Sequence, residues 1–279
     1  MTLEIIPDIA SLRARLAQEK NIAFVPTMGN LHAGHLHLIA LARQYADCVV
    51  ASIFVNPLQF GANEDLDNYP RTLAADCEKL ETAGANIVFT PTVSEMYPTA
   101  QTMRITPPPI ANELCGAARP GHFDGVATVV MKLFNIVQPQ VAIFGKKDFQ
   151  QLFIIRELVR QFNLPIQIIA GETQREESGL ALSSRNGYLS ASQKLEAQRL
   201  YRTLKLIADN VQQGNRDYRA IETQSSQYLT QLGWMVDYIS IRSALTLMPA
   251  NAEDRNLVAL AAARQGKTRL IDNIEFSVA

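Results

Sequence analysis

The stretch Phe24-Val25-Pro26-Thr27-Met28-Gly29-Asn30-Leu31-His32-Ala33-Gly34-His35-Leu36-His37 decides the fold that we expect for this chain. The apolar run over 21–25 is typical of a buried strand, and apolar residues follow at helical spacing from Leu36 to Arg43. The pattern predicts a strand, a turn marked by glycine, and the start of a helix. Glycines let a ligand approach the backbone closely, and the free N–H groups at a helix start favour anions. We interpret this segment as a phosphate site.

Two histidines in this segment are candidates for direct contact with phosphate. His32 and His35 are three positions apart, so both can lie on one face if the helix has begun by Ala33. An imidazole, neutral or charged, can donate a hydrogen bond to a phosphate oxygen. The simpler alternative is an accidental pair, or two capped histidines at the surface. A zinc site is disfavoured, because the three cysteines of the chain stand apart without paired spacing.

Composition narrows the function classes. A chain of 279 residues can form one large domain and a smaller one. Lys and Arg number 26 against 27 Asp and Glu, and this near-neutral balance argues against nucleic acid as the main partner. We see no signal-peptide pattern and no apolar run of the roughly 18 residues that a membrane helix needs. Unpaired cysteines fit a reducing compartment, so we expect a cytoplasmic protein that does not bind membranes.

The first part of the chain alternates apolar strand-like runs with helical patterns. Besides 21–25, we expect strands over 47–55, 86–90, 141–144 and 166–170, and helices over 73–83, 125–138 and 149–162. Because these strands lack strict polar alternation, they indicate a parallel sheet covered by helices on both faces. We therefore predict an α/β fold with a doubly wound, Rossmann-like parallel sheet.

The pattern changes from about Gln174. Two amphipathic helices are expected, from Ser190 or Ser192 to 213 and over 218–231, and strands are expected over 236–241, 257–263 and 268–271 with a hairpin turn at 265–267. Helices followed by antiparallel strands suggest a separate, smaller α+β domain. We therefore divide the chain into a domain over 1–173 and a C-terminal domain over 174–279.

Polar segments follow the ends of several predicted strands. In doubly wound sheets ligands bind beyond the carboxyl ends of the strands, close to a change in strand order. Lys147 beside Asp148 follows one strand, and its ammonium could contact phosphates, although a solvated pair is the commoner fate of such residues. Ser183, Ser184 and Arg185 offer two hydroxyls and a forked cation for phosphate oxygens. The alternative for that segment is a serine-rich loop that caps the next helix.

Three neutral amides and one carboxylate complete the set of candidate site residues. Asn56, Gln59 and Gln151 could recognise hydroxyl and carboxylate groups without titrating, whereas for Gln150 we favour ordinary polar surface. An acidic residue in the polar segment after Gln59 could hold Mg²⁺ through water, and we choose Asp76.

These phrases resemble known proteins. The segment from Thr27 to His35 is similar to the His-x-Gly-His signature of the nucleotidyltransferase superfamily, and Leu182-Ser183-Ser184-Arg185-Asn186 resembles the mobile loop that accompanies it. From about Val25 to the C-terminus the chain closely resembles the pantoate-β-alanine ligase family. The other phrases that carry this resemblance are Phe54-Val55-Asn56-Pro57-x-Gln59-Phe60, Tyr69-Pro70-Arg71-Thr72, Arg119-Pro120-Gly121-His122-Phe123, Phe144-Gly145-x-Lys147-Asp148-x-Gln150-Gln151 and Thr268-Arg269-Leu270-Ile271-Asp272-Asn273.

The resemblance implies a role for each matching position. Pantoate would lie against Gln59 and Gln151, next to Asn56, and His35 would be the catalytic histidine, acting with His32, Lys147, Ser183, Ser184 and Arg185. ATP would contact Met28, Gly29, Asn30, Leu31, His32, Ala33, Gly34, His35, Gly145, Lys146, Lys147, Asp148, Gln174, Leu182, Ser183, Ser184 and Arg185. The chain departs from the family pattern at Lys146, Gln174 and Ser178, and the change at Gln174 affects the expected packing of adenine.

The implied activity is an ATP- and Mg²⁺-dependent ligation of pantoate to β-alanine through a pantoyl adenylate, by a homodimer. Two alternatives remain open at this point. One is a nucleotidyltransferase that leaves AMP on a phosphorylated cofactor precursor, for which we would expect a basic pocket where this chain has Asn56 and Gln59. The other is a catalytically silent ATP-binding regulator, which the intact set of His, Lys, Ser and Arg residues disfavours.

Overall fold

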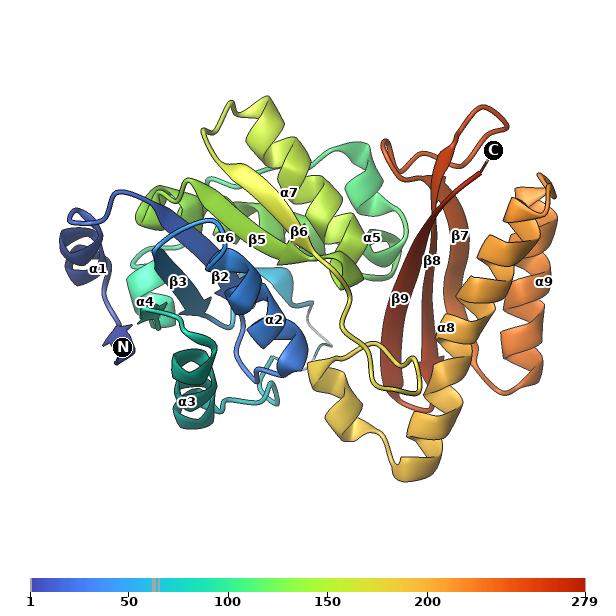
Figure 1. The fold of residues 1–279 in the computed structure, drawn as a ribbon, viewed down its shortest axis with the longest axis horizontal. Helices are drawn as coiled ribbons and strands as arrows, with labels where there is room; N and C mark the ends of the chain where they lie inside the picture. Colours follow the sequence, from blue (N-terminus) through green and yellow to red (C-terminus); the bar gives the residue numbers. More distant parts are fainter. Residues whose placement is uncertain (1, 62–63, 65, 279) are drawn as a thin grey trace.

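The chain folds around two sheets that lie side by side (Figure 1). The computed structural model describes residues 2–61, 64 and 66–278. A six-stranded parallel sheet forms the first part, and a three-stranded antiparallel sheet forms the second. Helices α8 and α9 lie against the smaller sheet on the side away from the larger one (Figure 1). The predicted fold class, a parallel doubly wound sheet with a small C-terminal α+β part, is confirmed.

The parallel sheet has the strand order β1-β4-β3-β2-β5-β6. Its strands are short and largely buried, as expected for apolar runs covered on both faces. Their bounds are Glu4–Ile6 for β1, Ile22–Thr27 for β2, Cys48–Ile53 for β3, Ile87–Phe89 for β4, Val141–Gly145 for β5 and Gln167–Gly171 for β6.

Each face of this sheet packs against its own helices. Leu12, Val130 and Leu152, from the helices of one face, join Phe24 in a single core. These helices are α1 (Ile9–Leu16), α6 (His122–Val137) and α7 (Phe149–Gln161). On the other face, α2 (Ala33–Ala42) and α3 (Leu73–Ala83) cover alternate residues of the same strands. Helix α3 ends at Gly84, which adopts a left-handed φ of 88°, as its position after the apolar pattern predicted.

The order in which the chain adds strands to the sheet reverses between β2 and β5. From β2 the chain proceeds to β3 and β4 on one side, and then returns to β5 and β6 on the other side. The loops that follow β2 and β5 therefore meet at the carboxyl edge of the sheet, where the strand order reverses. These loops begin at Met28 and at Lys146, so the fold brings the histidine segment next to Lys147.

The second sheet is buried on both faces. It consists of β7 (Met235–Ser243), β8 (Asn256–Gln265) and β9 (Thr268–Ser277), and the pairing of Gln265 with Thr268 closes the predicted hairpin. One face packs on α8 (Ala191–Gln212) and α9 (Tyr218–Gln231). The opposite face packs Val258 and Leu260 against Ile110 and Phe149 of the first part. This contact fixes the smaller sheet beside the carboxyl edge of the larger one.

The structure also contains elements that the sequence reading missed or placed differently. Strand β1 and helix α1 were not predicted, and α6 begins at His122 instead of at residue 125. Short helices link the main elements, namely η1 (Pro57–Gln59), α4 (Val93–Met96), η2 (Pro109–Asn112), α5 (Cys115–Ala118), η3 (Lys146–Asp148) and η4 (Ser184–Tyr188). Within the described residues, every helix is too short or too polar to cross a membrane.

Candidate active site

A buried carboxylate shapes the loop that precedes the two histidines. Gly29 and Asn30 both adopt positive φ, 85° and 51°, so the backbone turns sharply away from β2. Asp76 of α3 is fully buried, and its two carboxylate oxygens accept hydrogen bonds of 2.8 Å from the backbone N–H groups of Asn30 and Leu31. The hydroxyl of Thr72 donates a third bond of 3.0 Å. Asp76 therefore holds this loop in place.

This arrangement gives Asp76 a structural role beside the magnesium role that we expected, which stays a prediction. Its oxygens are occupied by donors of the protein, and Lys79 lies beside them, with Nζ 4.0 Å from Oδ1 and 2.8 Å from the carbonyl oxygen of Leu31. Both carboxylate oxygens thus accept hydrogen bonds from the protein, and Asp76 is fully buried. Among the described residues, no three His, Cys, Asp or Glu side chains gather to hold a metal.

The histidines cap the helix that they precede. His32 is the N-cap of α2, and its Nδ1 accepts a hydrogen bond from the N–H of Gly34, while Nδ1 of His35 accepts one from the N–H of His32. The ring centroids are 4.1 Å apart. Because both Nδ1 atoms act as acceptors, we assign the proton of each neutral ring to Nε2. A side chain at Gly34 would lie only 2.9 Å from the His32 ring, which explains the glycine between the histidines.

Both imidazoles are uncharged at neutral pH. Burial, followed by the neighbouring His35 and the charge of Lys147, lowers the pKa of His32 to about 3. Burial and the charges of Lys147 and Lys79 lower the pKa of His35 to about 4. The observed capping and the phosphate interpretation are compatible, because capping uses Nδ1 and leaves an Nε2–H donor on each ring.

Lys147 lies opposite the histidines, in the short helix η3 that follows β5. No carboxylate of the described residues lies within ion-pair distance of its ammonium, whereas Lys146 pairs with Glu172 at 2.6 Å and with Glu275 at 2.7 Å. The backbone of η3 is held from the second sheet, because the amide of Asn273 donates 2.9 Å bonds to the carbonyl oxygens of Lys146 and Lys147.

The Ser-Ser-Arg segment reaches the same place from the other part of the chain. Ser183 caps η4 by accepting a bond from the N–H of Arg185, so the capping alternative holds for this residue too. The preceding loop is held by Arg175, whose guanidinium donates bonds of 2.7 and 2.9 Å to Asp272 and stacks on Tyr201. Burial raises the pKa of Asp272, and the pairing with Arg175 opposes this increase.

Amide side chains form a second group at the floor of the site. Gln59 is 8% exposed and donates from Nε2 to the sulfur of Met28, while its Oε1 accepts a 3.1 Å bond from Asn56. Asn56 is itself saturated, because it also donates to the carbonyl of Gly125 and accepts bonds from the Leu58 N–H and the Tyr97 hydroxyl. Asn56 therefore orients Gln59, and its direct contact with substrate stays a prediction.

The two adjacent glutamines near the start of α7, Gln150 and Gln151, have different surroundings. Gln151 lines the site, and no bond of its amide to another described residue is found. Gln150 is 3% exposed, accepts a bond from the N–H of Cys115 and donates to the carbonyls of Ile110 and Glu113. The expectation of polar surface for Gln150 was wrong, since this amide is buried and anchors a neighbouring loop.

The sequence reading assigned no chemistry to His122, which lies at the back of Gln59. Its Nδ1 donates to the carbonyl of Gln59 at 2.8 Å, and its Nε2 accepts from Arg119 at 2.9 Å. Burial and the charge of Arg119 lower the pKa of His122 to about 4. Arg119 also pairs with Glu64. This chain of contacts fixes the backbone of η1. Only the joint position of Arg119 and His122 around the start of a helix could have indicated it from the sequence.

Most predicted site residues line one cavity of about 230 Å³. His35 and Arg185 lie in the same lining, together with Met28, His32, Gly34, Asn56, Gln59, Gly145, Lys147, Asp148, Gln151, Gln174, Leu182, Ser183 and Ser184. Gly29, Asn30, Leu31, Ala33, Lys146 and Asp76 are not in this lining. The cavity thus combines neutral donors, the ammonium of Lys147 and an amide floor, a set suited to a phosphate chain beside a small polar acid.

Comparison with known proteins gives consistent matches over the whole chain. The family model described as pantoate-beta-alanine ligase matches residues 4–275. The chain is 84% identical to pantothenate synthetase from Methylobacillus flagellatus, with 100% of both sequences covered, and 56% identical to that from Thiobacillus denitrificans, with 99% and 98% covered.

Solved structures agree with these matches. The fold is similar to the crystal structure of pantothenate synthetase from Thermus thermophilus, with a TM-score of 0.92, 43% identity, and 97% of this chain and 98% of that chain covered. It is also similar to a pantoate-beta-alanine ligase from Francisella tularensis complexed with beta-gamma ATP and beta-alanine. There the TM-score is 0.83 and the identity 35%, with 98% and 97% covered.

Proposed function

The chain belongs to the pantoate-β-alanine ligase family and is an ATP-dependent ligase that joins pantoate to β-alanine, and we propose how its side chains divide this work. One observation carries the assignment of roles. Two uncharged imidazoles, the ammonium of Lys147 and the Ser-Ser-Arg segment line the same cavity as Gln59 and Gln151. The nucleotidyltransferase alternative gains no support from the relatives.

The first step forms pantoyl adenylate. A carboxylate oxygen of pantoate attacks the α-phosphorus of ATP, a new O–P bond forms, and the bond from this phosphorus to the bridging oxygen breaks, so that pyrophosphate leaves. The Nε2–H groups of His32 and His35 donate to phosphate oxygens without adding charge. Lys147, Ser183, Ser184 and Arg185 stabilise the charge that spreads over the phosphoryl oxygens in the transition state.

Pantoate binds on the amide floor. Gln59 and Gln151 contact its hydroxyl and carboxylate groups, and Asn56 acts through Gln59, whose amide it orients. In the second step, the amine of β-alanine attacks the carbonyl carbon of the adenylate and the C–N bond forms. AMP leaves with the electron pair of the broken C–O bond, and the nitrogen loses a proton to solvent. No side chain is acylated or phosphorylated, so the protein contributes positioning and electrostatic stabilisation.

Magnesium would accompany ATP. Because Asp76 is enclosed and the described residues form no metal cluster, Mg²⁺ would be bound chiefly by phosphate oxygens and water, which is how this ion usually binds with nucleotides.

We also propose that the protein is a cytoplasmic homodimer. Sedimentation of the purified chain would measure its oligomeric state, and a monomer over the working concentration range would contradict the proposed homodimer.

The roles are tested by pantoate-dependent exchange between pyrophosphate and ATP, with AMP release measured after β-alanine is added. We expect exchange in the wild-type protein with pantoate and much less with other short hydroxy acids. The variant His35→Ala should lose about 10²–10⁴-fold in exchange rate, because one oriented donor to the transition state is removed. The matched control is His37→Ala in the same helix, outside the cavity lining. Unchanged exchange in His35→Ala would remove His35 from the mechanism.

A further inference from the structure

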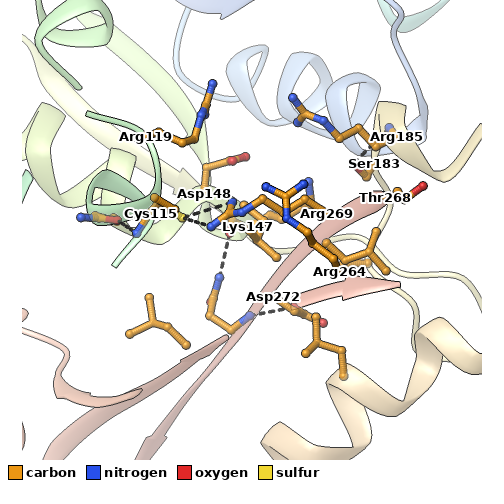
Figure 2. A pocket seen from close by; sticks show the side chains of 18 of the residues that line it. Cys115, Arg119, Lys147, Asp148, Ser183, Arg185, Arg264, Thr268, Arg269 and Asp272 are labelled. Carbon is orange, nitrogen blue, oxygen red and sulfur yellow. Dashed lines mark hydrogen bonds between the residues drawn. The ribbon is translucent and has the colours of Figure 1, made fainter. Parts of the chain in front are cut away.

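A second, larger cavity adjoins the candidate active site. It has a volume of about 800 Å³ and lies between the loops at the edge of the parallel sheet and the β8–β9 hairpin. Figure 2 shows the hairpin residues Arg264 and Arg269 close to Lys147 in the middle of this lining, with Arg119 and Arg185 farther out. None of the roles assigned above uses the hairpin side of this cavity.

The charge of this cavity is positive. Among the described residues, six basic side chains line it (Arg119, Lys147, Arg185, Arg264, Lys267 and Arg269) against three carboxylates, Glu64, Asp148 and Asp272. Two of these carboxylates are already paired, Glu64 with Arg119 and Asp272 with Arg175. The ring of His122 adds no charge at neutral pH, because burial lowers its pKa to about 4.

The hairpin side keeps an uncompensated positive charge. Asp237 lies 2.6 Å from Nε of Arg269 and 3.9 Å from Nε of Arg264, so one carboxylate serves two guanidinium groups. Lys267, in the hairpin turn, has no ion-pair partner among the residues that the structure describes. Two forked cations and one ammonium at a cavity wall favour a ligand with several anionic oxygens.

The two cavities share part of their walls. Lys147, Asp148, Gln151, Ser183 and Arg185 line both of them. Three of these, Lys147, Ser183 and Arg185, are groups to which the proposed function assigns the phosphates of ATP. The larger cavity therefore begins where the leaving group of the adenylation step is formed.

We propose that this cavity receives the pyrophosphate released by adenylation and binds it through Arg264, Lys267 and Arg269. The proposal rests on the proposed function, because pyrophosphate is formed only if pantoate attacks the α-phosphorus. The anion moves from Lys147 and Arg185 to the hairpin cations, and no covalent bond changes in this movement. Its departure leaves the adenylate in the smaller cavity for attack by β-alanine.

The test measures product inhibition by pyrophosphate in the complete reaction at fixed free Mg²⁺. For Lys267→Glu combined with Arg264→Glu we expect the inhibition constant of pyrophosphate to rise about 5- to 20-fold, while kcat and the KM for ATP stay within about twofold. Lys267→Arg, which keeps the charge, should behave as the wild type. The matched control is Lys205→Glu, an exposed residue of α8 that does not line the cavity.

Two results would overturn the proposal. An unchanged inhibition constant in the double variant, with a native circular dichroism spectrum, would show that the hairpin cations do not bind pyrophosphate. A parallel rise in the KM for ATP would show that they bind the triphosphate of the substrate instead. Calorimetric titration of pyrophosphate into the wild-type protein and the double variant separates these results from failure of the proposed function. This binding can be measured even if no pantoate-dependent exchange occurs.

Discussion

The imidazole of His35 is held uncharged by its surroundings, and this lowers the stability of the folded protein in acid. Its pKa is lowered from the ordinary value of 6.5 to about 4, chiefly by burial. The unfolded chain therefore binds this proton at a higher pH than the folded protein does. As the pH falls from 7 to 4.5, this residue should reduce the free energy of unfolding by roughly 2–3 kcal/mol, and above pH 6.5 its effect should vanish.

We expect His35→Gln to lose this part of the pH dependence. Urea unfolding at pH 7 and pH 4.5 gives the change in the free energy of unfolding for the wild type and for the variant. The difference between these two changes isolates His35, because the contributions of the other titrating groups cancel. His37→Gln controls for the loss of a histidine from the same helix. Equal changes in stability for the wild type and His35→Gln would mean that His35 titrates alike in the folded and unfolded chains.

Asp76 holds the histidine loop through backbone contacts. Asp76→Ala would leave the buried N–H groups of Asn30 and Leu31 without an acceptor, and we expect the free energy of unfolding to fall by about 2–5 kcal/mol. The rate of pantoate-dependent exchange should fall as well, because the loop positions both imidazoles. Glu78→Ala, an exposed change in the same helix, is the control for urea unfolding and exchange. An Asp76→Ala protein with unchanged exchange would contradict the positioning role.

The short helix η1 and its N-cap supply Gln59 and Asn56 to the amide floor, and helix α6 holds this segment in place. Asn56 connects them, because its amide donates both to Gln59 and to the carbonyl of Gly125. We expect Gln59→Ala to raise the KM for pantoate about 10-fold or more, through loss of hydrogen bonds to a charged ligand. Asn56→Ala should also raise the KM for pantoate, although the hydrogen bonds of the Asn56 side chain all go to other groups of the protein.

Gln150→Ala is the matched control for these two variants, since Gln150 is an equally buried amide whose bonds lead to the loop at 110–115. Steady-state kinetics with pantoate varied should show no change in KM for this variant, while urea unfolding should show a lowered stability. If Gln150→Ala raised the KM as much as Gln59→Ala does, the effect would reflect general loosening of the fold.

Elements with strong local patterns could be predicted from the sequence, and the remainder depended on tertiary contacts. The predictions of the strand before Met28 and of the glycine that ends α3 were correct, because an apolar run and a glycine after a helical pattern are local features of the sequence. Strand β1 has only three residues, of which one is buried, so no pattern could indicate it. The contacts of Asp76 with Asn30 span 46 positions, and no local signal marks a carboxylate as an acceptor for distant backbone groups.

The two sheets are joined where the phosphate groups are expected, and Asn273 of β9 makes this join. It is 5% exposed, and its amide donates 2.9 Å bonds to the carbonyls of Lys146 and Lys147. The position of Lys147 in the active site therefore depends on the docking of the smaller sheet. The bidentate pair of Arg175 with Asp272, the residue before Asn273, holds the Ser-Ser-Arg loop to the same strand.

We expect Asn273→Ala to raise the KM for ATP about 5- to 20-fold and to lower the free energy of unfolding by about 1–3 kcal/mol, because two half-buried carbonyls lose their donor and η3 loosens. Ser277→Ala, on the same strand but exposed, should change neither quantity. Kinetics with ATP varied and urea unfolding measure the two effects separately. A loss of stability with an unchanged KM for ATP would show that Asn273 only joins the sheets. A raised KM would show that docking of the second sheet sets the geometry of the phosphate site in the first.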